Sequence, residues 1–188
     1  MEQRVAQLFH NNVESTLHTA ESVAPLIAAA AKLLADTLIS ESKIMVAGAG
    51  NCGALGQIFV STLISQLHHE RPSLPAIALN AVVEQSHSDE IYRRQIRALG
   101  QPDDLLLVLA AEGTPNITDA ISTAHEKGMS VLVIGSSSAL RTISKLLGES
   151  DIEIPLPAHS LSTLYQVQLT TLLTLTDLID YQLFGVGD

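Results

Sequence analysis

The chain has 188 residues and a formal net charge of −10 at pH 7, and 46% of its residues are hydrophobic. This length suits one compact domain, and so high an apolar fraction predicts more buried surface than one small core needs. Only ten Lys and Arg residues are present, which argues against direct binding to nucleic acid. The densest basic group is interpreted as a solvated helix face; it comprises Arg93, Arg94 and Arg97.

The composition also indicates a compartment. The single cysteine, Cys52, excludes an internal disulfide framework and fits a reducing environment. The first residues lack the basic start and apolar run of a signal peptide, and polar residues interrupt every apolar stretch before it reaches the length of a membrane span. We therefore expect a cytoplasmic protein that does not interact with membranes.

Residues 1–40 are predicted to form an N-terminal helical arm. Apolar residues recur at helical spacing in both of its halves, and Pro25 is predicted to open a second helix. Two long helices ahead of the first strand cannot bury both faces on a small sheet. The arm is therefore expected to pack against other subunits.

Short apolar runs alternate with helical patterns through the remainder, residues 41–188. Strands are predicted at 43–47, 75–79, 104–110, 129–134 and 151–154, and helices at about 53–67, 89–99, 115–127, 139–147 and 160–184. This alternation predicts an α/β fold in which helices flank a doubly wound parallel sheet, in three flavodoxin-like layers. No linker or repeat divides the chain, so residues 1–188 are expected to form a single domain.

A glycine-rich turn follows the first predicted strand. Residues 48–53 match G-x-G-x-x-G, which suits a dinucleotide, but no acidic residue ends the second strand to hold a ribose. A tight turn at the switch point of the sheet is the preferred interpretation, with Gly50, Asn51 and Cys52 as weak candidates for binding a small ligand. Cys52 could be a reactive thiolate at a helix start, but a buried small residue is preferred.

Three serines follow the fourth predicted strand. Ser136, Ser137 and Ser138 could offer hydroxyls and a helix N-terminus to an anion, although a plain N-capping turn is preferred. Two histidine-containing stretches, 68–70 and 87–90, resemble metal-ligand clusters. Neighbouring histidines in irregular segments do not converge on one ion, so neither a metal nor another cofactor is expected.

Two strings carry a resemblance to a known family. ERPSLPAIALN, from Glu70, and DLIDYQLF, ending at Phe184, resemble the SIS-domain family of phosphoheptose isomerases, and more closely its DnaA initiator-associating (DiaA-type) branch. The resemblance covers nearly the whole chain and implies the SIS fold. For that branch it also implies a homotetramer that binds the replication initiator DnaA and promotes chromosomal replication initiation.

The residues that the family uses for catalysis are missing. The isomerases place an acid/base pair and metal ligands on two helices, and the matching positions here are Ile58, Ser61, Tyr165 and Leu173. Their Ser/Thr-rich phosphate turn is replaced by AAEGTP at 110–115, in which Glu112 opposes a phosphate. The loop at 80–88 also looks shorter than in relatives. Isomerase activity is therefore not expected.

The sequence thus favours a non-catalytic oligomeric scaffold that binds DnaA. Leu183 and Phe184, near the chain end, are the proposed partner contacts, and packing of both in the oligomer core is the alternative. Two other functions stay open. One is a sugar-phosphate sensor, and the other is an active sedoheptulose 7-phosphate isomerase that uses replacement groups from among His87, Asp89, Glu90, Glu112 and His159.

Overall fold

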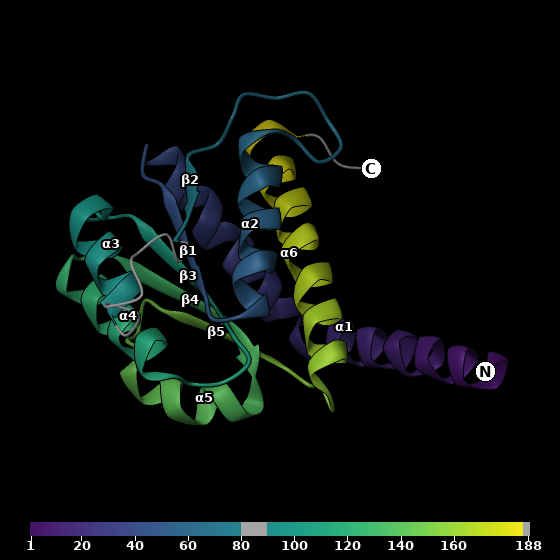
Figure 1. Cartoon of the computed structure of the whole chain (residues 1–188). Coiled ribbons are helices and arrows are strands. Elements are labelled where there is room, and N and C mark those ends of the chain that lie inside the picture. The colour runs from purple at the N-terminus through teal and green to yellow at the C-terminus, as the bar shows by residue number, and fades with distance from the viewer. Residues whose placement is uncertain (80–89, 186–188) are drawn as a thin grey trace.

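The computed structural model describes residues 1–79 and 90–185 and contains one five-stranded sheet in the order β2-β1-β3-β4-β5 (Figure 1). Every neighbouring pair of strands is parallel, which confirms the predicted doubly wound sheet. The central strands are buried at nearly every position, as expected for strands covered on both faces. The strands are β1 Ile44–Gly48, β2 Ala76–Ala78, β3 Leu105–Ala110, β4 Ser130–Ser136 and β5 Ile152–Leu156.

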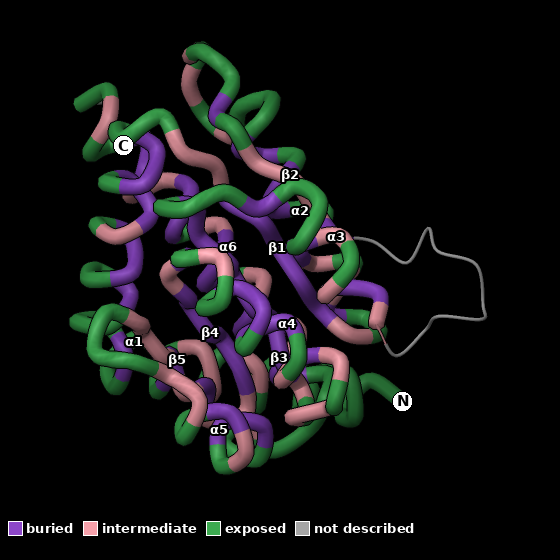
Figure 2. The backbone as a smooth tube through the Cα atoms, turned by 90° about the vertical axis from the view of Figure 1, so that its left-hand side faces the viewer, coloured by how far each residue is buried: buried purple, intermediate pink, exposed green. Residues whose placement is uncertain are grey.

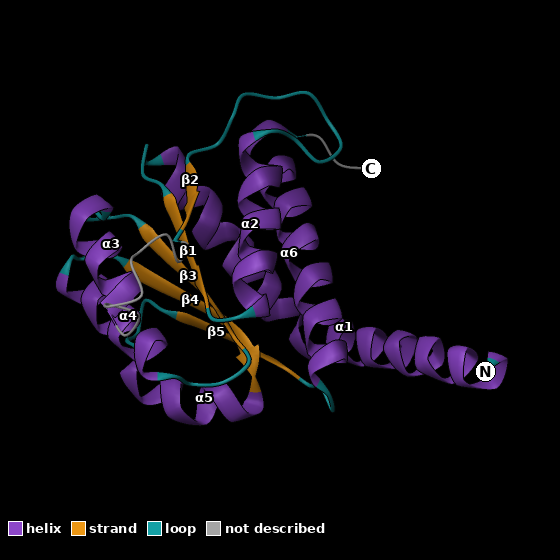
Figure 3. Ribbon diagram, viewed as in Figure 1, coloured by secondary structure: helices purple, strands orange, loops and turns teal. Residues whose placement is uncertain are grey.

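Helices cover both faces of the sheet and complete three layers (Figure 3). One buried apolar cluster joins the sheet to α1, α2 and α6, and a second joins it to α3, α4 and α5. The helices are α1 Glu2–Ile39, α2 Asn51–Ile64, α3 Ile91–Leu99, α4 Pro115–Glu126, α5 Ser137–Ile143 with a 3₁₀ turn at Ser144–Leu146, and α6 Leu161–Phe184.

The predicted break at Pro25 is wrong, because α1 is one helix of 38 residues with Pro25 inside it. Pro25 is exposed, while buried positions such as Val23 and Ile27 keep helical spacing on either side of it. Proline inside a helix costs about 3 kcal/mol through a lost hydrogen bond and a steric clash. Continuous packing of α1 against α6 and β5 outweighs that cost.

The first third of α1 extends away from the rest of the molecule (Figure 1), and nearly all of its residues are exposed (Figure 2). Five large apolar side chains remain exposed in the first half of α1, namely Val5, Leu8, Phe9, Val13 and Leu17. By length and composition alone, α1 could cross a membrane, so the prediction of no such segment is wrong; 44% of its apolar window is buried within the protein. A buried core helix of a protein without membrane spans can have the same length and apolar composition.

The register of the sheet brings three turns to one edge. Gly48 at the end of β1 pairs with Leu109 in β3, and Ala110 pairs with Gly135 in β4. The turns that follow these strands therefore begin side by side at the carboxyl edge, where open α/β folds bind ligands.

Candidate functional site

The glycine turn after β1 is built on close backbone contacts. A side chain at Gly48 would place its Cβ 2.7 Å from the carbonyl carbon of Cys52, and Gly50 precedes α2 with a φ of 58°. Only glycine fits both conditions without strain. Among the predicted ligand candidates, Asn51 is exposed, whereas Cys52 is fully buried.

Cys52 is tied to the last helix. Its thiol donates a hydrogen bond to Oε1 of Gln168 over 3.5 Å, and Nε2 of Gln168 donates to the carbonyl of Ile134 in β4 over 3.1 Å. Burial raises the pKa of the Cys52 thiol, which therefore stays neutral near pH 7. This geometry matches a buried small residue rather than a reactive thiolate.

Gln168 was missed by reasoning from the sequence, although a signal was present. It lies on the same face of α6 as the buried residues Leu164, Leu172 and Leu175. A polar side chain at such a position must find partners inside the protein. Its two partners are Cys52 in the first turn of α2 and Ile134 in β4.

Ser136 is the N-cap of α5, which is the interpretation preferred from the sequence. Its hydroxyl donates to the carbonyl of Ala111 over 2.6 Å and accepts from the amide of Ala139 over 3.1 Å. The hydroxyl of Ser138 lies 2.8 Å away, and Ser137 is exposed. The hydrogen-bonding capacity of Ser136 is therefore spent within the protein.

The loop after β3 is packed against α5. A Cβ on Gly113 would meet Cβ of Thr142 at 2.8 Å, and Pro115 occupies the first position of α4. The hydroxyl of Thr114, the residue before that helix, is buried without a hydrogen-bond partner among the described residues. Glu112 is exposed in the same loop.

Tyr92 holds the glycine turn from the opposite layer. Its hydroxyl donates to the carbonyl of Gly48 over 2.6 Å, and its ring is buried on α3. Burial raises the pKa of Tyr92 above its ordinary value. This contact links α3 to the site edge, and the sequence alone did not reveal it.

Residues 8–136 match the pattern described as the SIS domain. The chain belongs to the SIS-domain family. It is 37% identical to a phosphoheptose isomerase of Halorhodospira halophila, over 97% of this chain and 96% of that protein. It is 33% identical to the DnaA initiator-associating protein DiaA of Photorhabdus laumondii, over 98% of each.

A solved structure agrees with this assignment. The phosphoheptose isomerase from Francisella tularensis superposes with a TM-score of 0.88 at 30% identity, covering 95% of this chain and 97% of that one. The family thus contains sugar-phosphate isomerases as well as a protein named for its association with DnaA. The chain shares its fold and nearly its full length with both.

The four positions matched to SIS-family catalytic residues do not form an acid/base pair. Ile58 and Ser61 are exposed on α2, and Tyr165 and Leu173 are partly buried on α6. Ile and Leu side chains can neither transfer a proton nor ligate a metal, so these residues do not fit the catalytic metal that the family resemblance implies. Within residues 1–79 and 90–185, no three His, Cys, Asp or Glu side chains gather around a common point.

Three of the candidate replacement groups, Glu90, Glu112 and His159, lie in described segments, each on a different connection of the fold. Glu90 lies 3.6 Å from Arg93 on the surface, and His159 lines a polar groove between α1 and the start of α6. His87 and Asp89 fall outside the described residues, as does the loop at 80–88. The rings of His68 and His69 lie in a T-shaped arrangement with their centres 6.4 Å apart.

The two predicted partner contacts at the end of α6, Leu183 and Phe184, differ in their exposure. Leu183 packs partly against the core, whereas Phe184 is 38% exposed. Tyr181, three residues before Phe184, is 61% exposed. The exposed apolar pair in this single chain is therefore Tyr181 with Phe184.

Proposed function

We propose that this SIS-family chain acts as a single-domain, non-catalytic scaffold in the cytoplasm, where it assembles into a homotetramer, binds the replication initiator DnaA and promotes initiation. The observation that carries the proposal is the hydrogen bonding of the polar side chains at the carboxyl edge of the sheet. Cys52 donates to Gln168, Gln168 donates to Ile134, and Ser136 donates to Ala111, so these side chains are hydrogen-bonded within the protein. The positions of the family's acid, base and metal ligands carry apolar or poorly suited side chains.

The exposed arm supports the homotetramer. Residues 1–11 of α1 are exposed in the single chain, and an isolated helix of that length is marginal in water. Pairing the apolar stripe of the arm with other copies would bury it and stabilise the helix. A closed assembly would present repeated docking sites and gain avidity for its partner.

DnaA is proposed as the partner because a relative of nearly equal length is named for associating with it. The net charge of −10 suits a protein surface better than DNA. Phe184 is a suitable anchor because aromatic side chains are enriched among the residues that dominate interface energies.

A capture assay with immobilised DnaA tests this assignment. Phe184→Ala should weaken capture about tenfold or more, since it removes a central apolar anchor. Gln182→Ala, which changes an exposed neighbour on the same turn, should leave capture unchanged. Leu183→Ala should lower the melting temperature more than Phe184→Ala does, because Leu183 packs on the core. Equal capture by the Phe184 and Gln182 variants would contradict the docking assignment.

One observation favours a second function, binding of a sugar phosphate without turnover. The buried hydroxyl of Thr114 has no partner among the described residues and lies at the start of α4. A ligand oxygen could satisfy it. A rise in melting temperature with sedoheptulose 7-phosphate, lost in Thr114→Val, would support this second function.

A further inference from the structure

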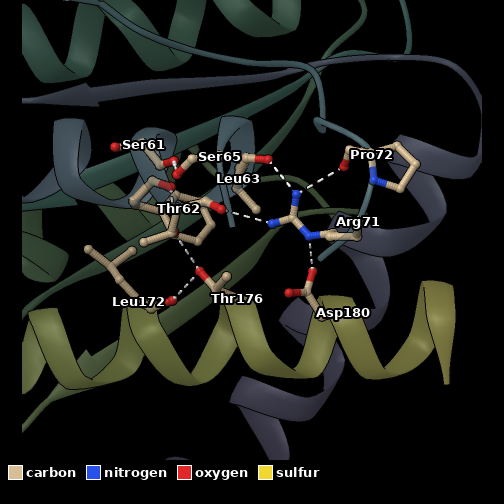
Figure 4. Close-up of polar contacts among 10 residues, drawn as sticks. Ser61, Thr62, Leu63, Ser65, Arg71, Pro72, Leu172, Thr176 and Asp180 are labelled. Carbon is tan, nitrogen blue, oxygen red and sulfur yellow. Dashed lines mark hydrogen bonds and ion pairs between the residues drawn. The ribbon is translucent and has the colours of Figure 1, made fainter. Parts of the chain in front are cut away.

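A fully buried ion pair joins α6 to the loop that follows α2 (Figure 4). Nε of Arg71 donates to Oδ1 of Asp180 over 2.6 Å, and the two side chains are 1% and 3% exposed. The residues are 109 positions apart in the sequence. A buried pair of this kind is costly to break, because the remaining partner is left as an uncompensated charge.

The same guanidinium closes the end of α2. Its two Nη atoms donate to the carbonyls of Thr62, Leu63 and Pro72 over 2.8, 2.7 and 3.1 Å. The last turn of α2 contains no basic residue of its own, so Arg71 supplies the positive charge and the donors that free helix carbonyls require. One side chain thus fixes the end of α2, the loop after it and α6.

A second polar contact lies one turn earlier. The hydroxyls of Thr62 and Thr176 are 2.9 Å apart and buried between α2 and α6. Gln168, Thr176 and Asp180 are spaced by eight and four residues, so they lie on one face of α6. These contacts fix the rotation and the register of α6 against the rest of the molecule.

That orientation decides what the last turn of α6 exposes. With Asp180 turned inward, Tyr181 and Phe184 are exposed and Leu183 packs partly against the core. Beyond Asp180, no side-chain hydrogen bond holds the remaining α6 residues within the described part of the chain. The ion pair is therefore the final polar attachment of the helix.

We propose that the Arg71–Asp180 pair is a positioning device that holds the last turn of α6 and so presents Tyr181 and Phe184 to the protein partner. The link to the partner rests on the function proposed above. Arg71 and Asp180 do not touch the partner themselves. They act through the helix end that they anchor.

Hydrogen exchange of the intact protein tests the anchor directly. In Asp180→Asn the amides of residues 181–185 should exchange about tenfold faster, because the last turn opens locally once its charged attachment is lost. Thr176→Val is the matched control, since it removes a buried polar contact from the same helix pair without leaving a charge. It should change exchange at 181–185 by less than about twofold.

Capture by immobilised DnaA is measured on the same variants, and a rescue variant separates positioning from damage. Asp180→Asn should lose about tenfold in capture, whereas Arg71→Met with Asp180→Leu, which replaces the pair by apolar side chains, should regain most of both exchange protection and capture. Unchanged exchange at 181–185 in Asp180→Asn overturns the anchor. Faster exchange with undiminished capture overturns its link to the partner. Absence of capture by the unsubstituted protein contradicts the proposed function. Hydrogen exchange at 181–185 then tests by itself whether the Arg71–Asp180 pair holds the last turn of α6.

Discussion

At the carboxyl edge of the sheet, several polar side chains are hydrogen-bonded within the protein itself. Gln168 accepts from Cys52 and donates to Ile134, and Ser136 bonds to Ala111 while capping α5. Each polar group that is buried here must be satisfied, or it costs free energy. Satisfying these groups internally therefore stabilises the fold around the turns at this edge.

Two buried acids make this edge sensitive to alkaline pH. Burial raises the pKa of Cys52 from its ordinary value of 9.0 and the pKa of Tyr92 from 10.0. The unfolded chain loses these protons first as pH rises, so the free energy of unfolding is unaffected by them below about pH 8 and falls above about pH 9. Urea unfolding at about pH 8 and at about pH 10.5 measures this fall in the free energy of unfolding.

The control for this prediction removes both acids. Cys52→Ala with Tyr92→Phe should be less stable at neutral pH, because packing and the bond to Gly48 are lost. Its stability should nevertheless fall less steeply between about pH 8 and about pH 10.5. An equally steep fall in both proteins would show that other groups dominate the alkaline response.

Among the helices, α1 exposes large apolar side chains that nothing within the described part of the single chain covers. Its exposed stripe includes Phe9, which is 71% exposed. Phe9→Glu should disrupt the assembly, because it removes about 2 kcal/mol of apolar burial per copy and places a charge in the interface. Light scattering should then report a mass below that of a tetramer.

Gln7 provides a matched control on the same helix. It bonds to Asn11 on the surface, two positions from Phe9 and on the other side of the helix. Gln7→Glu introduces the same side chain and charge, and it should leave the mass unchanged. A tetramer that persists in Phe9→Glu would show that the arm is not the assembly element.

The elements also show which sequence signals were sufficient. The five strands and most helices were predicted within a few residues, since short apolar runs and period-3.6 patterns are strong local signals. The break at Pro25 was not borne out, because a proline rule describes the local cost alone. Packing of α1 on α6 and β5 overrides it here.

For the molecule as a whole, the sequence does not reveal which polar residues far apart in the chain pair with one another. Arg71 and Asp180 could both be read as ordinary surface charges, and nothing in their local sequence joins positions 109 apart. The same holds for Cys52 with Gln168, separated by 116 positions. The catalytic losses could be proposed from the family pattern, but the internal bonds at the site edge required the structure.

We propose that this SIS-family chain has lost isomerase chemistry and serves as a scaffold. The most direct test of this proposal is turnover of sedoheptulose 7-phosphate by the purified protein with added zinc, with a phosphoheptose isomerase as the positive control. We predict no turnover above the rate without protein. Turnover that co-purifies with the chain through a second, independent purification would contradict the account and show that catalysis has moved to other residues.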